Sequence, residues 1–129
     1  MKIVKTLLFV LLMAGFQQVN GQTILTKWEN LGNFSEVLTK TNYVANEGLY
    51  DKLNQITPIL ADFSEKLDVN NIPEKLRTPK VNEAIAKLRS QTKSLNNLAS
   101  NKSSKEDLQN ELNAINLTYK ELIALCNLD

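Results

Sequence analysis

The chain has 129 residues, with 15 basic and 14 acidic side chains, a formal net charge of +1 and no histidine. This length allows one domain, and an apolar content of 43% is ordinary for a folded protein. The near-zero charge argues against a nucleic-acid binder, which needs a basic surface. The missing histidine removes the commonest general base and the commonest metal ligand.

Residues 1–21 have the pattern of an export signal. Two lysines precede an apolar run over residues 7–14 that is too short to span a bilayer, and the small residues Val19 and Gly21 mark a cleavage site. An uncleaved anchor helix is the alternative interpretation. We expect cleavage, which makes the protein periplasmic or secreted and leaves residues 22–129 as one domain without a membrane anchor.

Cleavage also changes the composition of the chain. Gln22 becomes the first residue, a feature that resembles exported proteins of the Bacteroidota. Both methionines and two of the 15 basic side chains lie in the removed segment, so 13 basic and 14 acidic side chains remain and the net charge becomes −1. The predicted mature chain therefore has neither histidine nor methionine.

Four consecutive segments carry apolar residues spaced alternately three and four apart, which places them on one face of a helix. These segments run from Ile24 to Leu38, from Leu49 to Leu67, from Val81 to Ala99 and from Leu108 to Cys126. No segment alternates with the period of a strand. The sequence therefore predicts an all-α fold, an antiparallel up-down-up-down four-helix bundle.

Capping signals mark the starts of the last two helices. Thr78 offers a capping hydroxyl directly before Pro79, which suits the first position of a helix. Ser103 and Glu106 have the spacing of a capping box. We expect the third and fourth helices to begin at these residues.

The second helix has a less regular pattern. We expect a turn over residues 42–45 and a cap at Asn46. Pro58 lies inside the apolar stripe, where its ring would clash with the carbonyl of Asn54. Either the helix kinks at Pro58 or a new helix begins at Thr57; the unbroken apolar spacing favours the kink.

The order of elements resembles the soluble periplasmic haem b cytochrome and its relative cytochrome c-prime. Two helices are followed by an extended crossover, residues 72–76 with the sequence Ile-Pro-Glu-Lys-Leu, and then by two more helices. The resemblance covers most of residues 23–127 and implies the same bundle. That family ligates haem iron through a methionine in the first helix and a histidine in the fourth, where this chain has Ile123. The Cys-x-x-Cys-His attachment is also missing, so the resemblance implies the scaffold without its cofactor.

Other motifs for metal binding or catalysis are weak. Asp62 with Glu65 and Asp107 with Glu111 form carboxylate pairs at helical spacing, but they lie off the apolar stripes, and solvated helix faces explain them. The hydroxyl side chains have no histidine to activate them. We expect no metal, no cofactor and no catalytic site.

Cys126 is the only cysteine. A free thiol in an oxidising compartment suits an intermolecular disulfide or a redox site. Because Cys126 continues the stripe of Tyr119 and Leu122, a small core residue is the favoured interpretation.

Several apolar residues lie off the main stripes. At 100° per residue, positions in the first and fourth helices point well away from the core, and two tyrosines flank the first turn. Trp28 and Phe34 lie on a broad face of the first helix. Aromatic anchors dominate protein interfaces, although scattered apolar surface residues are also normal. The predicted contact residues are Val37, Tyr43, Tyr50 and Leu117.

We therefore expect an exported, non-catalytic helical bundle that binds a protein partner or forms a homodimer. The alternative is a carrier of an apolar small molecule or tetrapyrrole between the helices. Ser35 and Thr92 interrupt the apolar stripes and would mark the level of such a ligand.

Overall fold

The computed structural model describes residues 24–68 and 70–126, and the predicted export signal lies outside these residues. Residues 24–27 form one helical turn before the first long helix. The elements that follow are α3 (Glu29–Asn46), η1 (Tyr50–Lys52), α4 (Leu53–Glu65), η2 (Glu74–Leu76), α5 (Pro79–Ser100) and α6 (Lys105–Cys126). Within the described part of the chain there is no strand, which confirms the all-α prediction.

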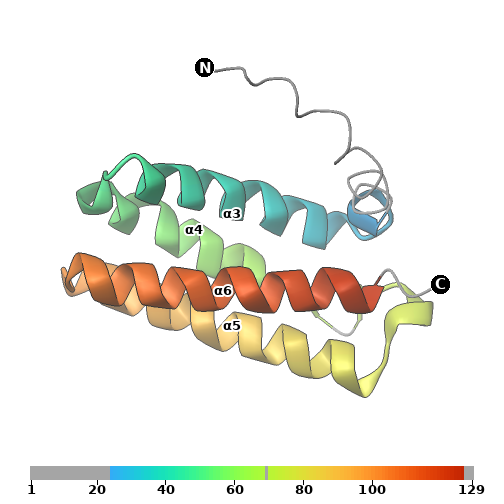
Figure 1. Ribbon diagram of the computed structural model, residues 1–129. Helices are drawn as coiled ribbons and strands as arrows, with labels where there is room; N and C mark the ends of the chain where they lie inside the picture. Colours follow the sequence, from blue (N-terminus) through green and yellow to red (C-terminus); the bar gives the residue numbers. More distant parts are fainter. Residues whose placement is uncertain (1–23, 69, 127–129) are drawn as a thin grey trace, which may run out of the picture.

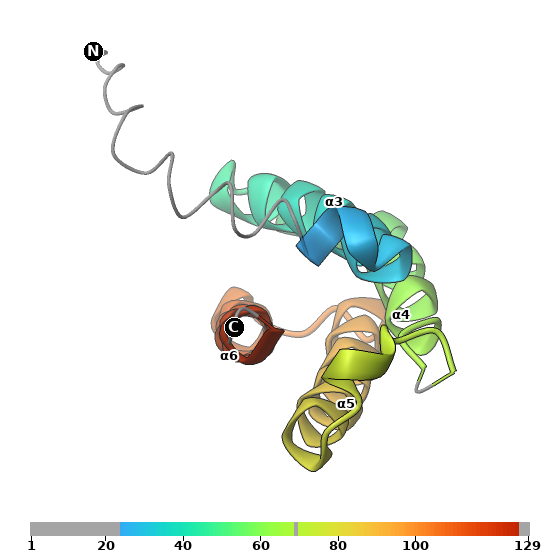
Figure 2. The ribbon, with the colours of Figure 1, turned by 90° about the vertical axis from the view of Figure 1, so that its right-hand side faces the viewer.

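The four long helices lie lengthwise beside one another (Figure 1). Close backbone contacts join each helix to the next one in the chain: α3 to α4, α4 to α5, and α5 to α6. The first and last of them, α3 and α6, approach each other less closely, and Figure 2 shows α6 standing apart from α3. These contacts are consistent with the expected up-and-down course of the chain.

The predicted apolar stripes, together with Ile72 of the crossover, supply the core. Its largest fully buried side chains are Trp28, Leu31, Phe34, Leu53, Leu60, Leu67, Ile72, Leu88, Leu95, Leu112, Ile115 and Leu122. Burying one such side chain stabilises a fold by about 1.5–3 kcal/mol. A chain with one cysteine forms no internal disulfide, so this packing holds the helices together. In residues 24–68 and 70–126, no helix combines the length and apolar character needed to cross a membrane.

The end of α3 differs from the prediction. The expected turn over residues 42–45, with Asn46 as the next cap, is wrong, because α3 continues to Asn46. Gly48 ends the helix with a φ of +76°, a conformation that glycine adopts without steric cost. Its N–H donates to the carbonyl of Ala45 at 3.0 Å, which satisfies one of the last carbonyls of α3.

The second long helix, α4, is shorter than predicted from the apolar stripe that begins at Leu49. It begins at Leu53, because the preceding residues form the separate 3-10 turn η1. Pro58 lies inside α4, and the helix continues through it. The alternative that a new helix begins at Thr57 is therefore wrong.

A hydroxyl side chain caps the start of each of the last two helices, as predicted, but at α6 the capping residue differs by one position. Thr78 caps α5: its side chain accepts a hydrogen bond from the N–H of Val81 at 3.2 Å, which confirms the predicted start. At α6 the predicted cap, Ser103, is wrong by one residue. Ser104 takes this role, and its hydroxyl accepts from the N–H of Asp107 at 3.1 Å.

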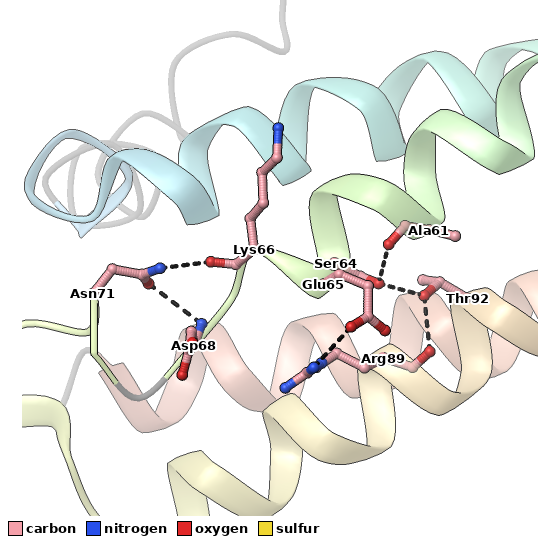
Figure 3. Close-up of polar contacts among 8 residues, drawn as sticks. All are labelled: Ala61, Ser64, Glu65, Lys66, Asp68, Asn71, Arg89 and Thr92. Atoms are coloured by element: carbon pink, nitrogen blue, oxygen red, sulfur yellow. Dashed lines mark hydrogen bonds and ion pairs between the residues drawn. The ribbon is translucent and has the colours of Figure 1, made fainter.

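One asparagine fixes the crossover between α4 and α5. The side-chain amide of Asn71 donates to the carbonyl of Lys66 at 2.6 Å, and its Oδ1 accepts from the N–H of Asp68 at 3.3 Å (Figure 3). The same Oδ1 accepts from the indole N–H of Trp28 at 3.1 Å. Asn71 therefore ties the crossover to the end of α4 and to the residue that precedes α3.

The cap of α5 is open to a direct test. Replacing Thr78 by alanine removes the acceptor for the N–H of Val81, and we expect the free energy of unfolding to fall by about 1 kcal/mol. Thr78→Ser keeps the hydroxyl and is expected to retain most of the stability. Urea unfolding followed by circular dichroism measures both variants; equal losses for alanine and serine would show that the hydroxyl does not cap the helix.

Candidate functional site on the α3–α6 face

A reciprocal pair of amides bridges the wide seam between α3 and α6. The Nδ2 of Asn42 donates to the Oδ1 of Asn116, and the Nδ2 of Asn116 donates to the Oδ1 of Asn42, both at 2.9 Å. The two side chains are partly buried. Each amide thus donates one hydrogen bond to the other and accepts one from it. The pair therefore fixes how α3 and α6 are aligned along their length.

Two tyrosine hydrogen bonds extend this bridge along the seam. The hydroxyl of Tyr119 donates to the Oγ of Ser35 at 2.7 Å, and the hydroxyl of Tyr50 donates to the Oε1 of Gln109 at 2.6 Å. Burial raises the pKa of Tyr119 above its ordinary value of 10.0, although the hydrogen bond with Ser35 opposes that rise. Tyr119 therefore stays a protonated donor at neutral pH. Within residues 24–68 and 70–126, these hydrogen bonds across the seam all join side chains.

Two large apolar side chains lie exposed on the outer side of the seam. Tyr43 is 62% exposed and Leu117 is 66% exposed. Each directly follows one member of the asparagine pair, whereas the residue before each asparagine is fully buried. Because a helix turns by 100° per residue, the residues before the pair face the core and those after it face outward. We call the surface formed by Asn42, Tyr43, Asn116 and Leu117 the α3–α6 face.

The α3–α6 face lies in a part of the chain without charge. Residues 41–46 and 112–119 contain no charged side chain, although 22% of all residues are charged. Depletion of charge around exposed aromatic residues is typical of the centre of protein interfaces. The face therefore has the composition of a contact surface.

The predicted contact residues divide into exposed and buried ones. Tyr43 and Leu117 lie together on the α3–α6 face, and Tyr50 lies half-buried in η1 at one end of the seam. The expectation that Val37 points away from the core is wrong, because it is only 9% exposed. Its helix packs against α4 as well as facing the centre of the molecule, so the buried side of α3 is wider than its apolar stripe.

The broad aromatic face of the first helix is buried, and two exposed apolar residues were not predicted: Leu49, which was expected to begin a buried stripe, and Ile59. Trp28 and Phe34 are fully buried in the core, so they form no partner surface. Ile59 is 46% exposed on α4. It directly precedes the buried Leu60, so the rotation of 100° that identified Leu117 would also have identified Ile59.

The residues that suggested a ligand between the helices bond to one another. Thr92 of α5 lies 2.7 Å from the hydroxyl of Ser64 of α4, and these hydroxyls also reach the carbonyls of Arg89 and Ala61 (Figure 3). Two hydroxyl protons serve these three contacts, so two of them are hydrogen bonds at any moment. Ser35 likewise accepts from Tyr119. These hydroxyls therefore link helices to each other.

Glu65, from one of the predicted acidic pairs, and Ile123, which stands where the haem family has its histidine, both contact other side chains of the bundle. Glu65 forms an ion pair with Arg89 at 2.8 Å on the surface (Figure 3), which contributes little stability. Ile123 packs partly buried against the core. In the described ranges, 24–68 and 70–126, no three cysteine or acidic side chains are placed to hold a metal ion.

Comparisons of the chain with protein-family models, with curated proteins and with solved structures found no match. The α3–α6 face is therefore interpreted from its own geometry and composition.

The thiol of Cys126 allows a test of burial at the end of α6. Burial raises its pKa from the ordinary value of 9.0 to about 11, because the thiolate would lose its hydration. We expect the folded protein to react slowly with a thiol reagent at pH 8, and faster only as the pH approaches 11. The chain unfolded in urea is the control and is expected to react as an ordinary thiol. Equal rates for the folded and unfolded chain at pH 8 would contradict burial of Cys126.

Proposed function

We propose that this protein is an exported, non-catalytic helical bundle that associates with a second copy of itself through the α3–α6 face. The observation that carries the proposal is the exposure of Tyr43 and Leu117 on either side of the Asn42–Asn116 pair. The export signal expected in residues 1–21 supports a periplasmic or secreted location. The absence of histidine from the whole chain supports a non-catalytic role.

We infer that the bundle has an up-down-up-down course. Along α3 and α6 the residue numbers run in opposite directions, since Ser35 bonds to Tyr119 and Asn42 bonds to Asn116. The bonds between α4 and α5 follow the same rule. This course supports the proposed interface, because it places the first and last helices side by side.

A second copy is the occupant that the charge of the face favours. The centre of the face is uncharged, and the residues one helical turn away carry both signs: Lys40 of α3, Glu47 directly after α3, and Lys120 and Glu121 of α6. The face therefore meets its own copy without net like-charge repulsion, and a two-fold axis brings the same patch of each copy together. An amide carries both donors and acceptors, so it can pair with an identical group, as Asn42 and Asn116 do with each other. A strongly charged partner would find no complementary charge there.

The expected association is weak. Only two large apolar side chains, Tyr43 and Leu117, are exposed on this face, and burial of each contributes about 1.5–3 kcal/mol before the cost of association. We therefore expect a dimer with a Kd of about 10–100 μM.

Sedimentation velocity from about 1 μM to about 1 mM covers this range of affinity and tests the proposal. We expect the wild-type protein to pass from monomer to dimer as its concentration rises. The double variant Tyr43→Lys/Leu117→Lys places like charges against each other in the dimer and is expected to remain monomeric. Ile59→Lys is the matched control, because it changes an exposed apolar residue on α4, and it is expected to dimerise like the wild type.

Two outcomes would overturn the proposal. A wild-type protein that stays monomeric at every concentration would exclude self-association, and a different protein bound through this face would then have to be sought. A dimer lost in Ile59→Lys but kept in the double variant would place the interface elsewhere. Circular dichroism of each variant shows that the helices remain folded.

A further inference from the structure

A hollow of about 590 Å³ lies where η2 and the start of α5 meet the end of α6. Its inner side is apolar: Val81 is buried, and Leu76 and Leu125 are partly buried. Among the described residues, the charged groups that line it are the exposed amines of Lys75 and Lys80. The hollow is thus an apolar floor with a positively charged edge.

A second hollow of about 590 Å³ continues the first along α5 and α6. Lys80 and Leu125 line both, so the two form one groove. The second hollow has a further apolar floor at Ala84 and Ala124, and beyond the shared Lys80 it carries the carboxylates of Glu83 and Glu121 and the amine of Lys87. An anion is therefore attracted more strongly to the end of the groove at Lys75, where the lysines face no carboxylate, than to the other end, where the charges balance.

The amines at the positive end are available to a ligand. Within residues 24–68 and 70–126, neither Lys75 nor Lys80 forms an ion pair; the pair that is formed joins Arg89 to Glu65. Binding an anion there would break no ion pair of these amines with the described residues.

We propose that this groove binds a single-chain anionic amphiphile, such as a free alkyl carboxylate. The head group would lie between Lys75 and Lys80, and the alkyl chain would cover Leu76, Val81 and Leu125 before continuing along the groove. The volume and the mostly apolar lining with a few charged groups match those of small-molecule sites. The groove lies on α5 and α6, and the proposal does not depend on self-association through the α3–α6 face.

Isothermal titration calorimetry of the full chain with dodecanoate, below its micellar concentration, tests the proposal. We expect dodecanoate to bind at least about tenfold more tightly than hexanoate, because the longer chain buries more apolar surface. Dodecyltrimethylammonium has the same chain and the opposite charge, and it is expected to bind more weakly, because Lys75 and Lys80 repel its head group. Vesicles containing phosphatidylglycerol are expected not to retain the protein.

Matched variants locate the site. Lys75→Gln/Lys80→Gln is expected to weaken dodecanoate binding about tenfold or more, which corresponds to 1.4 kcal/mol. Lys40→Gln/Lys93→Gln removes the same charge from exposed positions outside the groove and is expected to bind like the wild type. Glutamine at these exposed sites leaves the core unchanged, so the helical circular dichroism signal is expected to persist in both.

Several results would overturn the proposal. Equal affinity for hexanoate and dodecanoate would exclude a chain site, and binding of the cationic amphiphile as tight as that of dodecanoate would exclude recognition by the lysines. Equal losses in the two double variants would show attraction to net charge alone. Retention by the vesicles without binding of dodecanoate would indicate a membrane surface instead of a free amphiphile.

Discussion

The reciprocal amide pair between Asn42 and Asn116 is the interaction on which the closure of this structure depends. The other neighbouring helices follow one another in the chain and make close backbone contacts, whereas α3 and α6 approach less closely. No internal disulfide helps to join them, because the chain has one cysteine. The pair also fixes the outward direction of Tyr43 and Leu117, so the geometry of the proposed interface follows from the bond that closes the fold.

Hydrogen-bonded polar pairs also fix the alignment of α4 against α5. The hydroxyl of Thr57 donates to Asn96 at 3.0 Å, and the hydroxyls of Ser64 and Thr92 lie 2.7 Å apart. A leucine core alone tolerates sliding of one helix along another, but a buried hydroxyl that loses its partner costs about 1–3 kcal/mol. These pairs therefore select one alignment of α4 and α5, which in turn determines which of their faces reach the surface.

The sequence was a good guide to the core and a poor one to features that depend on distant residues. The apolar stripes identified buried residues such as Leu88 and Ile115, because burial of one helix face is a local pattern. Asn42 looked like a turn residue, since nothing local shows that Asn116 will pair with it. Val37 was predicted to be exposed because the sequence of α3 alone does not show how wide a face of this helix packs against α4. The end of α3 could have been predicted from the sequence, because a glycine such as Gly48 commonly follows the last residues of a helix.

A double-mutant cycle on the free energy of unfolding tests the closure most directly, with the variants Asn42→Ala, Asn116→Ala and the combination of both. Each single change leaves the remaining amide without its partner, so we predict that the double change costs less than the sum of the single changes, by about 1–2 kcal/mol. Strictly additive losses would show that the two amides contribute independently, and would contradict the account of how α3 and α6 are held together.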